Sequence, residues 1–121
     1  MLLTFIERAN AHDLSGLTLL MTDDHAFVNA AGEVTRGREM AADLWQSYLE
    51  WLPDYRIDVE RVVGEGNVVA LFGSVHGTPI DSPTGTWDIP AAWQGVVTDG
   101  RLSELRIYVD TYPMRQAAEP T

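Results

Sequence analysis

Thr98-Asp99-Gly100-Arg101-Leu102-Ser103-Glu104-Leu105-Arg106-Ile107-Tyr108-Val109-Asp110 is a turn followed by a segment in which apolar and polar side chains alternate. An Asp-Gly pair in this setting is a strong short-range signal of a β-hairpin. The segment from Leu102 to Asp110 is therefore predicted to be a strand that pairs with the long strand before the turn, Trp87 to Val97.

The two faces of this last strand differ, because successive side chains of a strand point to opposite sides. Leu105, Ile107 and Val109 lie on one face, and Arg106, Tyr108 and Asp110 lie on the other. We expect the polar row to face an interior cavity. We expect the apolar row to pack in a homodimer interface on the outer face of the sheet.

Further strands and turns precede this hairpin. Tyr55 to Val63 and Val68 to His76 alternate with period two around a glycine-containing turn, which predicts a second hairpin. Pro90 lies inside the long strand and cannot donate a ladder hydrogen bond, so it predicts a bulge or an edge position. A short strand is also expected from His25 to Asn29.

The first half of the chain carries apolar residues at helical spacing. Helices are predicted from Leu2 to Ala9, from Leu14 to Met21 with Asp13 as its cap, and from Arg38 to Leu52, where Pro53 ends the pattern. The expected class is α+β, with a cone-shaped, curved antiparallel sheet packed on three N-terminal helices. Such a sheet leaves a conical cavity, where ligands usually bind.

Size and composition limit the classes of function. With 121 residues and 45% hydrophobic content, a single domain over 1–121 is expected, ordered from about residue 2 to 116. A net charge of −10 disfavours nucleic acid and anionic membrane surfaces as partners. The chain has no cysteine and no apolar run of membrane-spanning length, so a cytoplasmic protein is expected. Its three histidines are dispersed and lack the spacing of metal ligands, so no metal site is expected.

The order of elements resembles that of the nuclear transport factor 2-like superfamily. The residues that carry this resemblance are Asn10-Ala11-His12-Asp13-Leu14, Thr22-Asp23-Asp24 and Gly37. Within the superfamily, the chain resembles the SnoaL-like polyketide cyclases, over roughly Phe5 to Gln116. That closer resemblance rests on the segments Gly73 to Gly77, Ser82 to Gly85, Thr98 to Leu102 and Tyr108 to Asp110, with Gln116 six residues further on.

This resemblance implies roles for two residues. Asp110 matches the acidic residue that the cyclases use as acid and base in an intramolecular aldol closure. His76 matches the histidine of their Gly-Thr-His segment, although Ser74-Val75 replace the usual residues before it. In related ketosteroid isomerases, the base and the oxyanion donor would fall on Asn29 and Phe5, so neither role is retained. Limonene epoxide hydrolases share an aspartate at the place of Asp110, but Ser74-Val75-His76 stands where they carry Arg-x-Asp.

The catalytic candidates are Asp110, His76 and Tyr108. In an apolar cavity the pKa of Asp110 would rise toward neutrality, so its carboxyl would move a proton next to a carbonyl group. His76 and Tyr108 would then stabilise the enolate oxygen. The alternatives are a surface aspartate paired with Arg106, an exposed histidine at a strand end and a tyrosine that serves only as cavity wall.

Several residues are candidates for holding the ligand. They are Trp45, Tyr48, Trp87 and Trp93, whose rings can stack on a flat molecule, together with Asn29 and Arg106. Aromatic residues at such spacing also form ordinary hydrophobic cores, and Asn29 also suits a turn.

The sequence thus predicts a cofactor-independent isomerase or cyclase that acts on a small hydrophobic, polyketide-like carbonyl compound by acid–base catalysis. Such a proton transfer needs neither a metal ion nor a nucleotide. Two alternatives stay open, a small-molecule-binding or assembly domain without turnover and an epoxide hydrolase.

Overall fold

The computed structural model describes residues 1–81 and 85–110, so Gln116 and the segment Ser82 to Thr84 lie outside the described residues. In chain order the elements are α1 (Leu2–Asn10), α2 (Leu14–Leu19), β1 (Met21–Val28), β2 (Val34–Arg36), α3 (Arg38–Trp51), β3 (Arg56–Glu65), β4 (Val68–Gly77), β5 (Trp87–Thr98) and β6 (Arg101–Val109). No helix in the described part of the chain is both long and apolar enough to cross a membrane.

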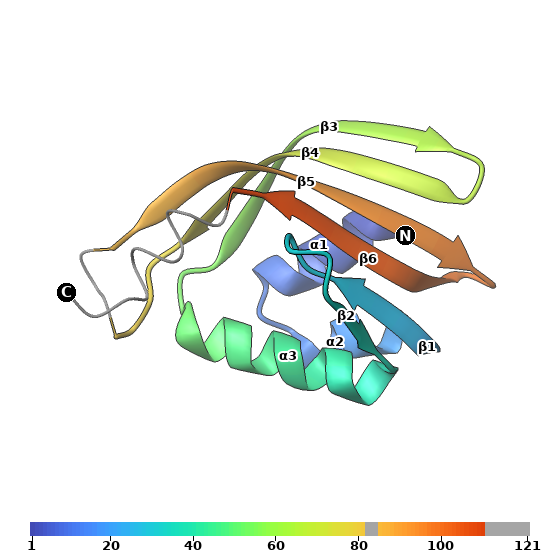
Figure 1. Ribbon diagram of the computed structural model, residues 1–121, viewed down its shortest axis with the longest axis horizontal. Helices are drawn as coiled ribbons and strands as arrows, with labels where there is room; N and C mark the ends of the chain where they lie inside the picture. The colour runs from blue at the N-terminus through green and yellow to red at the C-terminus, as the bar shows by residue number, and fades with distance from the viewer. Residues whose placement is uncertain (82–84, 111–121) are drawn as a thin grey trace.

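The strands form one curved, open sheet in the order β2-β1-β6-β5-β4-β3. Strands β1 and β6 are parallel, and every other neighbouring pair is antiparallel. Figure 1 shows the sheet arching over α1, α2 and α3, so the helices cover its concave face. The expected α+β class, with a curved sheet on three N-terminal helices, is confirmed.

Local sequence accounts for several of these boundaries. The Asp13 side chain accepts a hydrogen bond of 3.0 Å from the Gly16 amide, which caps α2 as predicted. Asp99 and Gly100 both have positive φ, as the two central residues of a type I′ hairpin turn require. Helix α3 ends at Trp51, just before Pro53.

Two details differ from the expectations, and a third decides between two predicted alternatives. Strand β1 begins at Met21, so Thr22-Asp23-Asp24 lies inside a strand that the sequence predicts only from His25. Strand β2 is not predicted by the sequence, because three residues are too short for a periodicity to show. Pro90 pairs in register with Ser74 of β4, and the pairing of β5 with β6 stops at Ala91, so its position is a local edge rather than a bulge.

The predicted orientation of β6 is wrong. Leu105 is fully buried in the hydrophobic core, and Ile107 and Val109 pack against that core from the concave side. The apolar row is therefore removed from water inside the molecule, so it is not available to pack in a dimer interface. Tyr108, from the opposite row, is 52% exposed. The homodimer itself stays a prediction.

His25 is a fully buried titratable residue between β1 and β6. Its Nδ1 lies 2.8 Å from the carbonyl oxygen of Leu102, and because a carbonyl only accepts, Nδ1 carries the proton and donates it. The enclosed Nε2 has no hydrogen-bond partner. Burial lowers the pKa of His25, although the bond to Leu102 and the charges of Asp24 and Glu104 act in the opposite direction.

We therefore expect the free energy of unfolding to fall as the pH drops below about 6.5, the ordinary pKa of histidine. Below this pH the unfolded chain binds a proton at His25 more readily than the folded protein does. The contribution of His25 to the free energy of unfolding is therefore fully present above this pH and declines below it. One such proton gives a slope of at most about 1.4 kcal/mol per pH unit. Urea unfolding between pH 7.5 and 5.5 measures this slope.

A His25→Gln variant is the control, because glutamine retains a hydrogen-bond donor but does not titrate. Its unfolding free energy should vary less with pH over the same range. Equal slopes in the two proteins would show that His25 does not carry this dependence.

Candidate functional site

An apolar cavity lies between α3 and the concave face of the sheet. Its lining comes from α3, from three strands and from the residue before β3: Phe27, Leu44, Trp45, Tyr48, Tyr55, Trp93 and Ile107. The cavity volume is about 20 Å³. A cavity of this size holds about one water molecule.

Trp45 stands at the centre of the aromatic side chains that form this site. Its ring centroid lies 5.7 Å from that of Phe5, 6.2 Å from Phe27, 6.1 Å from Tyr55 and 6.3 Å from Tyr48. The first three contacts are edge-to-face, the arrangement that aromatic quadrupoles favour. These neighbours on several elements fix the position of the indole ring.

The polar groups at the cavity are neutral hydrogen-bond donors. Burial raises the pKa of Tyr48, and burial together with the neighbouring Tyr48 raises the pKa of Tyr55, so both hydroxyls stay protonated. Trp45 is 6% exposed, and its indole N–H is enclosed without a hydrogen-bond partner. Such a site can bind an uncharged molecule and polarise an oxygen atom on it, but its lining contains no group able to act as a base at neutral pH.

His76 lies in a separate cluster on the other face of the sheet. Its Nε2 is 3.2 Å from a carboxylate oxygen of Asp54, and its Nδ1 is 3.9 Å from one of Asp88. The amide and hydroxyl of Thr78 both donate to Asp54, at 2.8 Å and 2.7 Å. Desolvation raises the pKa of Asp54, but the hydrogen bonds from Thr78 and the charge of His76 outweigh it, and the net effect is a lowered pKa.

The other two catalytic candidates do not line the cavity. Tyr108 pairs with Ala92 of β5, next to the pair Trp93 and Ile107 that does line it, and therefore lies on the opposite face. Asp110 follows the last residue of β6 and is exposed. The structure therefore does not bring Asp110, His76 and Tyr108 together around the cavity, and their catalytic roles stay predictions.

The candidate binding residues divide into two groups. Trp45, Tyr48 and Trp93 line the cavity, and their role in holding a ligand stays a prediction. Trp87 instead packs its ring 5.8 Å from that of Trp51 and is absent from the lining.

Asn29 and Arg106 are also outside the lining. The Asn29 side-chain oxygen accepts hydrogen bonds from the amides of Ala31 and Glu33, so Asn29 is the turn residue that the sequence left open as an alternative. Arg106 pairs with Gln94 of β5 on the same side of the sheet as Tyr108.

Sequence reasoning missed several lining residues. Phe27, Tyr55 and Ile107 reach the cavity from segments far apart in the chain. The alternation of β6 could have identified Ile107, since an apolar row normally faces the core. No local pattern marks Phe27 or Tyr55 as neighbours of Trp45.

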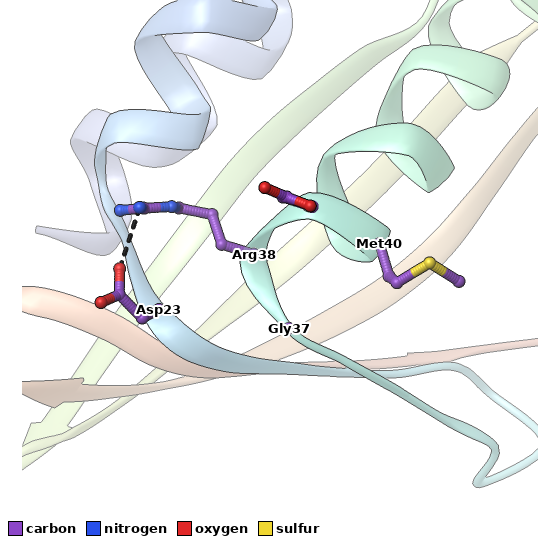
Figure 2. A pocket seen from close by; sticks show the side chains of 5 residues that line it. Asp23, Gly37, Arg38 and Met40 are labelled. Atoms are coloured by element: carbon purple, nitrogen blue, oxygen red, sulfur yellow. Dashed lines mark ion pairs between the residues drawn. The ribbon is translucent and has the colours of Figure 1, made fainter.

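A second, open hollow lies at the start of α3 (Figure 2), lined by Asp23, Gly37, Arg38, Glu39 and Met40. Arg38 forms an ion pair of 2.9 Å with Asp23 across it. Gly37 has φ +94°, a conformation that favours glycine, and its amide donates to the carbonyl of His25. The charged side chains of this hollow are therefore paired with each other or exposed to solvent.

Among residues 1–81 and 85–110, no group of three acidic or histidine side chains is arranged to hold a metal ion.

The sequence pattern of the SnoaL-like domain matches residues 2–105 of this chain. The chain therefore belongs to the SnoaL-like domain family, as the resemblance implied. The match ends at Leu105, before Tyr108 and Asp110. No curated protein sequence matches the chain well enough to be counted as a relative.

Solved structures with the same fold share little sequence with this chain. A protein with a ketosteroid isomerase-like fold from Catenulispora acidiphila, solved in complex with trimethylamine, is 16% identical, with a TM-score of 0.85 over 98% of this chain and 92% of the other. A candidate SnoaL-like polyketide cyclase from Jannaschia is 22% identical, with a TM-score of 0.84 over 98% and 90%. An LEH-like epoxide hydrolase from M. tuberculosis is 18% identical, with a TM-score of 0.81 over 96% and 84%.

Proposed function

We propose that this protein binds a small, uncharged, mostly apolar molecule in the cavity between α3 and the sheet. The composition of the lining carries this proposal, because all seven side chains are apolar or aromatic and none is charged. A charged ligand would lose its hydration there without gaining a counter-ion. The protonated hydroxyls of Tyr48 and Tyr55 add neutral polar contacts.

Ligand entry requires side chains to move, because the cavity volume of about 20 Å³ is far below that of an organic ligand. Leu44 is 38% exposed and lines the cavity, so it forms part of the entrance. Trp45 and Trp93 are deeply buried and form the base. Displacement of Leu44 is therefore the simplest way to open the site.

We expect a Leu44→Ala variant to bind a small aromatic ketone such as acetophenone more tightly than the unchanged protein, by about three- to tenfold. The shorter side chain enlarges the cavity, so the ligand no longer has to displace it. Calorimetric or NMR titration measures the dissociation constants. Val62→Ala, which shortens an exposed apolar side chain on β3 away from the cavity, should leave the affinity unchanged. Absence of binding by both the unchanged protein and Leu44→Ala would rule the proposal out.

A second candidate is a cofactor-independent isomerase or cyclase that uses the same cavity. Family membership and the Jannaschia neighbour favour it. In this reaction the Asp110 carboxyl moves the proton next to the carbonyl. It requires the Asp110 carboxyl to reach the bound ligand. An Asp110→Asn variant separates the two candidates when ligand affinity and product formation are both measured. An enzyme should lose about a hundredfold in turnover through this change. A binding protein should form no product before or after the change and should keep its ligand affinity.

A further inference from the structure

One residue that lines the cavity has a buried polar group without a hydrogen-bond partner in the described part of the chain. Five enclosed side-chain atoms lack a hydrogen-bond partner in the described part of the chain, and they belong to Thr22, His25, Trp45, His76 and Trp87. Of these residues, only Trp45 also lines the cavity. A buried donor without a partner is unfavourable, and a native protein that retains one commonly uses it.

The indole N–H differs chemically from the other polar groups of the lining. It donates and cannot accept, whereas the hydroxyls of Tyr48 and Tyr55 do both and can rotate. The ring also cannot turn away easily, because four aromatic neighbours surround it. A fixed donor in an apolar site therefore selects for a ligand with a matching acceptor and against the same shape without one.

Resting on the proposed function, we infer that Trp45 determines specificity, with its N–H donating a hydrogen bond to an uncharged oxygen acceptor of the ligand. Among the small, uncharged, mostly apolar molecules of the proposed function, the expected ligands are therefore those with a carbonyl, ether or hydroxyl oxygen. Purely hydrocarbon molecules of the same shape leave the donor unpaired and bind more weakly.

Acetophenone and α-methylstyrene form a suitable probe pair, because the second replaces the carbonyl oxygen of the first with a methylene group of similar size. We expect the unchanged protein to bind acetophenone about tenfold more tightly. In Trp45→Phe, which keeps an aromatic ring and removes the donor, the two affinities should become nearly equal.

Trp87→Phe is the matched control. Trp87 is as deeply buried as Trp45 and also has an unpartnered N–H, but it does not line the cavity. This variant should keep the tenfold preference for the ketone. If Trp45→Phe does not fold, the indole N–H resonance of Trp45 in the unchanged protein provides the test, since it should shift with acetophenone and not with α-methylstyrene.

The possible failures are distinguishable. Equal binding of both probes by the unchanged protein, with no selective shift of the Trp45 resonance, would overturn the inference and leave the proposed function standing. A preference for the ketone that survives in Trp45→Phe would also overturn it and would assign the donor role to a tyrosine. If neither probe binds even to Leu44→Ala, the proposed function itself is wrong.

Discussion

Replacement of Leu105 by alanine is expected to lower the free energy of unfolding by about 2–5 kcal/mol. Leu105 is completely buried, pairs with Gly95 of β5 and Phe27 of β1, and belongs to the core. Alanine at this position loses the transfer energy of the side chain and leaves a void between the sheet and the helices. Equilibrium denaturation in urea, with the m-value checked for constancy, measures the change.

Tyr108→Ala on the same strand is the matched control. Because Tyr108 lies on the opposite face and is half exposed, its loss should cost about 0.5 kcal/mol. The pair therefore tests the orientation of β6 directly. If Tyr108→Ala proved the more damaging change, the polar row would face the interior, as the sequence alone predicts.

Gly73→Ala is expected to be among the most damaging single substitutions, with a loss of about 3 kcal/mol or more. A Cβ atom at Gly73 of β4 would overlap the backbone carbonyl of Asp58 on β3, next to the irregularity between Val59 and Arg61. Since backbone atoms cannot move aside by changing rotamer, the two strands would have to separate. Thermal and urea unfolding both report this loss.

Gly64→Ala is the control for this substitution. Gly64 lies on β3, and the nearest atom to an added Cβ is the carbonyl oxygen of Val68 at 3.9 Å, an ordinary contact distance. Alanine there should be neutral or stabilising by about 0.5 kcal/mol, because it restricts the unfolded chain. Similar losses for the two substitutions would show that backbone approach at Gly73 is not the cause.

The local parts of the fold were predictable from sequence. The Asp99-Gly100 turn, the Asp13 cap and the end of α3 before Pro53 each depend on a few neighbouring residues, and the structure confirms them. The parallel pairing of β1 with β6 depends on residues far apart, so no local pattern indicates it.

The candidate site was predictable only in part. Trp45 and Tyr48 belong to the periodic face of α3 and can be identified from it, whereas Phe27 and Tyr55 join them only through the tertiary fold.

The orientation of β6 shows that its polar residues do not predict which face of the strand points into the protein. The burial of Leu105, Ile107 and Val109 stabilises the fold more than the burial of a polar row would, because apolar side chains gain free energy on leaving water and polar side chains lose it unless they are paired. The apolar row is therefore directed inward and Tyr108 outward.

The pairing of β1 with β6 affects how the chain folds during its synthesis. His25 and its partner Leu102 are 77 positions apart, so β1 leaves the ribosome long before β6 exists. Until then the backbone groups of Met21 and Phe27 have no strand to pair with on that side. Until β6 is synthesised, the nascent chain therefore has an unpaired strand edge at β1, which is open to pairing with another chain.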